Sequence, residues 1–98
     1  MRARRVEDIF NAADAQPGDF DLVRDRTGAY RSMGFRCPAC ATVAALTLHR
    51  VGEPAPGDRG PVWQWNGGED RPTLTPSVIH AGTCGWHGWL REGQWESV

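Results

Sequence analysis

Hydrophobic residues recur with two different spacings along the chain, and each spacing predicts a different kind of element. Near the start, Val6, Ile9, Phe10 and Ala13 are three or four residues apart. This is the period of an amphipathic helix, in which such residues share one face. The pattern predicts a short helix over Val6–Ala15, which at this length would be marginal unless it docked on the domain or on a partner.

Beyond residue 18 the period shortens to two, which is typical of β-strands. Phe20 and Leu22, for example, share one face of their segment. The predicted strands are residues 19–25, 29–35, 41–51, 62–66 and 71–80, followed by a hairpin over 89–98 that turns at residues 91–93. Helix is a weaker alternative for 41–51, and the Pro- and Gly-rich residues 52–61 predict a loop. Pro72 and Pro76 cannot donate to a β-ladder, so their segment is expected at a sheet edge.

The chain has 98 residues, which suits one small domain. Hydrophobic residues make up 40% and charged residues 23%, a globular composition. Two parts are expected: a leader with the short helix over residues 1–18, and a β domain over 19–98. Domains of this size often need a disulfide or a metal for stability.

The charge balance argues against several classes of protein. The net charge is −1, all basic residues are arginine, and apart from a short run at residues 2–5 they are interspersed with acids. Nucleic-acid binders normally present a basic face, so this class is not favoured. No segment is long and apolar enough to cross a bilayer, and the N-terminus lacks the apolar core of a secretory signal. A cytoplasmic protein is expected, in which stable disulfides are rare.

Two pairs of potential metal ligands lie in short turns. Cys37 and Cys40 are three residues apart in FRCPAC, and Cys84 and His87 have the same spacing in CGWH. Two such pairs provide the four ligands of a closed, tetrahedral Zn²⁺ site, and this set uses every cysteine in the chain. The sequence therefore predicts a small, mainly β, zinc-ribbon-like domain with one structural Zn²⁺ bound by Cys37, Cys40, Cys84 and His87.

These residues also allow other interpretations. Cys37 and Cys40 could form a redox pair, or the thiols could be buried and inert. The redox interpretation lacks a βαβ context and leaves Cys84 and His87 unexplained. His49 or His80 could replace His87 as a ligand, although neither shares its spacing with a cysteine.

The remaining aromatic and hydroxyl side chains have simpler structural explanations. The five tryptophans could form a platform for bases or sugars, but a small β domain is expected to use most of them in its core, with Trp86 in the metal turn as the exception. Thr73, Thr75 and Ser77 form a row typical of the solvated side of an edge strand. A nucleophilic Ser77 would need a paired base, and none is evident in the sequence.

Three segments, FRCPAC, WQWNGGEDRPTLTPSVI and CGWHGWLREGQW, resemble motifs of a family of small bacterial and phage proteins that lacks an established activity. Some of its members carry the label ammonia monooxygenase. The resemblance covers Phe35–Trp95. The family's cysteine and histidine positions are taken to bind zinc, which implies Cys37, Cys40, Cys84 and His87 here. Some relatives accompany phage genes or ubiquitin-like conjugation genes, which implies an adaptor role.

The chain departs from the family pattern at two points that bear on the metal turns. Many members place the histidine directly after the third cysteine, whereas Gly85 and Trp86 intervene here. Ala41 follows Cys40 where zinc turns often have glycine. If that turn needs a left-handed backbone, Ala41 is expected to be strained.

These observations favour a non-catalytic zinc module that binds another protein as an adaptor, with the edge at residues 71–77 available to a partner strand. A metal-dependent hydrolase or deaminase is the first alternative, although no histidine or cysteine is followed by the glutamate of a zinc deaminase. A binder of single-stranded nucleic acid is the second. The pattern of residues leaves the oligomeric state and the identity of the partner open.

Overall fold

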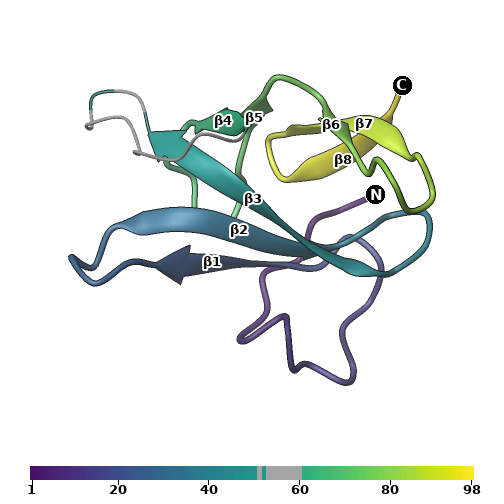
Figure 1. Cartoon of the computed structure of the whole chain (residues 1–98), viewed down its shortest axis with the longest axis horizontal. Helices are drawn as coiled ribbons and strands as arrows, with labels where there is room; N and C mark the ends of the chain where they lie inside the picture. The colour runs from purple at the N-terminus through teal and green to yellow at the C-terminus, as the bar shows by residue number, and fades with distance from the viewer. Residues whose placement is uncertain (51, 53–60) are drawn as a thin grey trace.

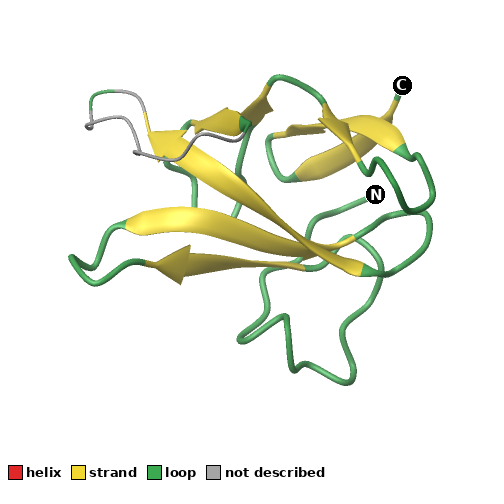
Figure 2. Cartoon of the chain, in the orientation of Figure 1, coloured by secondary structure: helices red, strands yellow, loops and turns green. Residues whose placement is uncertain are grey.

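The computed structural model describes residues 1–50, 52 and 61–98, and this part of the chain is built from β-strands without a helix (Figure 2). The strands are β1 (Phe20–Arg24), β2 (Tyr30–Arg36), β3 (Val43–Arg50), β4 (Val62–Trp65), β5 (Leu74–Thr75), β6 (Val78–Ile79), β7 (His87–Arg91) and β8 (Gln94–Ser97). The prediction of a small, mainly β domain is confirmed. The loop predicted over 52–61 lies almost wholly outside the described residues. None of the described segments forms a helix that could span a membrane.

The strands form two sheets (Figure 1). The larger has the order β1-β2-β3-β4-β5, and the smaller has the order β6-β7-β8. Neighbouring strands are antiparallel, except that β3 and β4 are parallel from the Thr47–Val62 pair onward. The predicted extended segment 71–80 is divided between the sheets, and each part is an edge strand as its prolines require.

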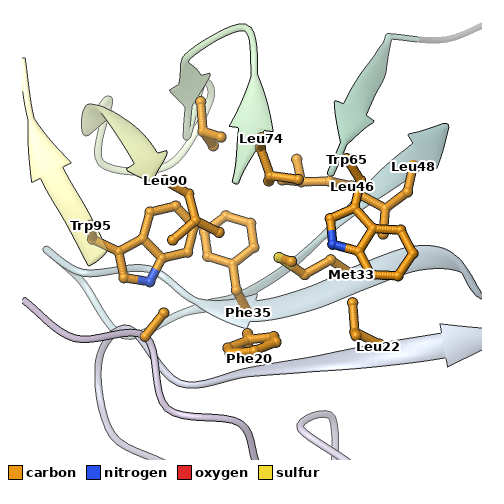
Figure 3. Close-up of a cluster of buried hydrophobic side chains, with 12 residues drawn as sticks. Phe20, Leu22, Met33, Phe35, Leu46, Leu48, Trp65, Leu74, Leu90 and Trp95 are labelled. Carbon is orange, nitrogen blue, oxygen red and sulfur yellow. The ribbon is translucent and has the colours of Figure 1, made fainter. Parts of the chain in front are cut away.

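The hydrophobic core lies between the two sheets (Figure 3). Alternate residues of β1 and β2 point inward from the larger sheet, whereas Leu90 and Trp95 point inward from the smaller one. The buried cluster consists of Ala3, Phe20, Leu22, Met33, Phe35, Leu46, Leu48, Trp65, Leu74, Val78, Leu90 and Trp95. Two of the tryptophans are therefore core residues, and Trp63 and Trp86 pack against this cluster.

The helix predicted over Val6–Ala15 is not present, and turns take its place. The backbone instead pairs with the edge strand β1: Val6 N donates to Phe20 O at 2.8 Å, and Phe20 N donates to Arg4 O at 2.9 Å. Ile9 is fully buried against Gly34 of β2, and a Cβ atom at residue 34 would clash with the Ile9 side chain. Tertiary pairing and burial therefore override the helical period.

The smaller sheet is a meander whose two turns differ in length. The β7–β8 turn at Glu92 and Gly93 has φ values of 50° and 73°, and it confirms the turn predicted at residues 91–93. The β6–β7 connection is longer and covers residues 80–86. Val78 pairs with Gly88, and Ile79 pairs with His87. This register sets the face of the small sheet on which His87 lies relative to His80.

Candidate metal centre and serine–histidine pair

Four side chains from two loops converge at one end of the molecule. Cys37 and Cys40 come from the β2–β3 connection, and His80 and Cys84 come from the β6–β7 connection. Their ligand atoms all lie within 4.8 Å of one another, so the cluster could hold one metal ion. All three cysteines are free thiols.

The distances fit a tetrahedral ion. Cys37 Sγ lies 3.5 Å from Cys84 Sγ, and His80 Nδ1 lies 3.6 Å from Cys40 Sγ and 3.8 Å from Cys84 Sγ. A tetrahedral Zn²⁺ with bonds of about 2.3 Å to sulfur and 2.0–2.1 Å to nitrogen separates its ligand atoms by roughly 3.5–3.8 Å. A disulfide would require sulfur atoms about 2.05 Å apart. The donor set therefore matches a metal site with three thiolates and one imidazole.

The first turn is held by its own backbone. Cys37 N donates to Thr42 O at 3.0 Å, and Ala41 N donates to Cys37 O at 2.9 Å. Ala41 has a φ of 63°, the left-handed conformation that the sequence indicated would strain it. Burial raises the pKa of the Cys37 thiol, whereas hydrogen bonds from the side chain and backbone of Thr42 lower the pKa of Cys40 to about 6. A lowered thiol pKa favours the thiolate that metals bind.

The second loop is closed by two backbone hydrogen bonds. His80 N donates to Trp86 O at 2.8 Å, and Gly85 N donates to His80 O at 3.0 Å. Gly82 and Gly85 have φ values of 77° and 73°, which only glycine adopts without strain. The loop therefore returns sharply enough to bring His80 and Cys84 to the same point.

The histidine in the cluster is not the one that the sequence predicted. The predicted cysteines Cys37, Cys40 and Cys84 come together, but His80 lies with them and His87 does not. His87 is the first residue of β7 and pairs with Ile79, so its side chain points to the face opposite to that of His80. His49, the other alternative, lies in β3 and is not part of the cluster.

His87 has a different partner, which is Ser77. Ser77 Oγ and His87 Nε2 lie 2.7 Å apart, and both residues are partly exposed. Ser77 directly precedes β6 and shares the outer face of the small sheet with Ile79 and His87. In the part of the chain that the structure describes, Ser77 is the one hydrogen-bond partner of the His87 side chain.

The main chain at Ser77 is anchored by a tryptophan from the other sheet. Trp63 Nε1 donates to Ser77 O at 3.2 Å. Trp86 packs edge-on against Trp95, and its Nε1 donates to Ser97 Oγ at 3.0 Å. These contacts hold both ends of the β6–β7 hairpin against the body of the domain.

A hydroxyl that lies within hydrogen-bonding distance of an imidazole is the arrangement of an activated nucleophile. The sequence did not reveal this pair, because Ser77 and His87 are ten positions apart and no motif links them. The signal that could have found it is the hairpin register, since a loop over 80–86 brings residue 77 beside residue 87.

The chain matches one protein-family model over residues 6–98, and that family is described as the bacterial ubiquitination-like system serine protease, BubE. Neither the comparison with curated proteins nor that with solved structures gave a match. Since the match covers nearly the whole sequence, the chain belongs to the BubE family.

Proposed function

We propose that this member of the BubE family is a serine protease in which Ser77 is the nucleophile and His87 is its general base. The observation that carries the proposal is the distance of 2.7 Å between Ser77 Oγ and His87 Nε2. The family description supports the same chemistry and suggests a protein of a bacterial ubiquitination-like system as the substrate.

The proposed reaction follows from the chemistry of this pair. With its proton on Nδ1, His87 accepts the hydroxyl proton at Nε2 while Ser77 Oγ attacks the carbonyl carbon of the substrate amide. His87 then donates that proton to the leaving nitrogen, and an ester to Ser77 remains. Water attacks the ester with His87 again as base, which releases the acid and restores the serine.

The metal has a structural role in this proposal. Cys37, Cys40, His80 and Cys84 would bind one Zn²⁺ and fill its tetrahedral shell, so no position remains for substrate or water. The ion would tie the β6–β7 connection to the β2–β3 connection. Ser77 and His87 flank this tied loop, so its order helps to set their relative position. Reduced thiols of this kind suit the cytoplasm.

The sequence analysis predicted that the chain binds another protein. In the present proposal, that protein is the substrate. A purely non-catalytic adaptor would also use a closed metal site, but it would have no need for a serine that faces an imidazole. A metal-dependent hydrolase would need an open coordination position, which four protein ligands do not leave. The hydrolase chemistry is therefore assigned to Ser77 and His87 and not to the metal.

The proposal is tested with diisopropyl fluorophosphate, a small reagent that modifies activated serines. The metal-loaded protein is expected to gain one phosphoryl adduct, located on Ser77 by peptide mass spectrometry. Ser77→Ala should abolish the adduct, and His87→Ala should slow its formation by orders of magnitude. Ser32→Ala, the same exchange in β2, is the matched control and should react normally. A folded, metal-loaded protein that shows no adduct, or an adduct that persists in Ser77→Ala, would contradict the proposal.

A further inference from the structure

A cavity of about 340 Å³ lies between residues of β3, β4 and β6, and its lining includes Val78 and Ile79, which directly follow Ser77 in the chain. Its walls include residues from the first half of β3, from β4 and from β6, namely Ala44, Ala45, Leu46, Trp63, Val78 and Ile79. Ligand pockets usually measure about 300–1,000 Å³, so this one suits a short segment and not a folded domain.

Within the described residues, two strands that border the cavity each have one edge without a β-partner. Val43–Leu46 of β3 pair with β2 there, and the pairing of β3 with β4 begins at Thr47. β6 is the outer strand of the small sheet, and its described partner is β7. Unpaired strand edges can hydrogen-bond an added extended chain, which is a frequent mode of peptide recognition.

The chemistry of the lining selects for uncharged, apolar groups. Ile79, although a large hydrophobic residue, is 55% exposed at the border of the cavity. Among the described residues of the lining, His80 is the one ionisable side chain, and its Nδ1 faces the cysteine cluster. A carboxylate or ammonium group brought against these described residues would therefore lose hydration without gaining a charged partner.

The cavity is joined to the proposed nucleophile by direct contacts. Trp63 lines the cavity and also donates its indole N–H to Ser77 O. Val78, the next residue after Ser77, is part of the wall, and Ile79 pairs in register with His87. A chain bound along β6 would therefore extend toward Ser77, the residue that directly precedes this strand.

We infer that this cavity, called here the β3–β6 groove, binds an extended apolar segment of the polypeptide substrate next to the bond that is cleaved. The inference rests on the proposed function, because the bound segment is a substrate only if the protein cleaves it. Binding itself can be measured without cleavage. The segment would pair its backbone with the edge of β3 or β6 and bury an aliphatic side chain against Trp63 and Ile79.

The test uses the metal-loaded Ser77→Ala variant, which binds without cleaving, and two blocked peptides. One is acetyl-Ala-Val-Leu-Val-Ala-amide, and the other has aspartate in place of the central leucine. In two-dimensional NMR spectra, the apolar peptide is expected to shift the backbone amides of Ala44–Leu46 and Ile79. The aspartate peptide should bind at least about tenfold more weakly, because its charge has no partner in the groove.

Two arginine variants in the same background provide a matched comparison. Ala45→Arg places a charge at the border of the groove, and Ala13→Arg places one in the N-terminal segment; both alanines are exposed, so both variants should fold. Only Ala45→Arg should weaken binding of the apolar peptide, by at least about tenfold. Shifts that lie elsewhere, equal binding of the two peptides, or no shifts up to the solubility limit of the peptide would overturn the inference.

Failure of this inference is distinguishable from failure of the proposed function. If fluorophosphate modifies Ser77 in the native chain but the groove amides do not respond to peptide, the serine is reactive and the groove assignment is wrong. If the groove binds the apolar peptide but Ser77 stays unmodified, the binding site stands and the protease proposal is wrong.

Discussion

Exchanging His80 and His87 separately for alanine should produce two different defects, although the residues are seven positions apart on one hairpin. His80 contributes a ligand atom to the cysteine cluster, whereas His87 contacts Ser77. His80→Ala is expected to weaken metal binding and stability. His87→Ala is expected to remove serine reactivity while the metal stays bound.

The size of the first defect follows from the ligand count. Structural zinc sites in small domains contribute about 10–16 kcal/mol, and an even share among four ligands gives about 2.5–4 kcal/mol for one. That share corresponds to a loss of roughly 10²–10³ in metal affinity. Domains of this size have stabilities of about 5–15 kcal/mol, so His80→Ala should lower the unfolding midpoint clearly when metal is limiting.

The size of the second defect follows from the partly exposed position of His87. Among the described residues its side chain has one hydrogen-bond partner, Ser77, so the alanine variant should lose only about 1 kcal/mol of stability. Removal of the histidine base in a serine protease lowers kcat by roughly 10⁶, and a large loss is likewise expected for serine modification.

Both variants can be compared in three measurements. Competition with a chromophoric chelator gives the metal affinity, urea unfolding followed by tryptophan fluorescence gives the stability, and fluorophosphate labelling under saturating metal gives the reactivity. Each variant serves as the control for the other. If His87→Ala released the metal while His80→Ala retained it with unchanged affinity, the assignment of the two histidines would be reversed and the reasoning refuted.

Three further predictions concern stability. Ala41→Gly should raise the free energy of unfolding by about 1 kcal/mol in urea titrations, because glycine adopts the φ of 63° without strain; a loss would contradict this. Trp95→Phe should cost about 1–3 kcal/mol by the same method, since it removes the buried bond of 2.9 Å to Gly18 O; no change would show that water replaces it. Burial alone would raise the pKa of Asp19, but hydrogen bonds from the Arg4 side chain and from Gln16 N hold this pKa below its usual value. The ionised Asp19 carboxylate therefore stabilises the fold above about pH 4, and this stabilisation is lost as the pH falls through the folded-state pKa. Asp19→Asn should accordingly show a smaller decline of the urea midpoint below about pH 4.

Much of the fold could be predicted from local pattern. Alternating residues such as Phe20 and Leu22 identified the strands, and Glu92–Gly93 identified the last turn, because these signals act over a few neighbours. The N-terminal segment was mispredicted because its conformation depends on distant residues. Ile9 needs the space left by Gly34, and the backbone near Val6 pairs with Phe20. The hydrophobic period of neighbouring residues cannot reveal such contacts with distant residues.

The candidate site, like the fold, could be predicted only in part from the sequence. The cysteines could be identified from spacing, since Cys37 and Cys40 lie in one turn and Cys84 is the only other cysteine. The choice between His80 and His87 depends on which face of a hairpin each residue occupies, and this is set by the pairing of Ile79 with His87. A shift of the register by one residue would bring both histidines to the same face of the hairpin.

The β6–β7 hairpin carries two candidate metal ligands in its loop, and the proposed nucleophile and base lie on either side of that loop. If the proposed function holds, a newly made chain would gain full activity only after it had bound its ion, because the same short segment binds the metal and positions the reacting pair. Proteolysis would then depend on the supply of a trace metal.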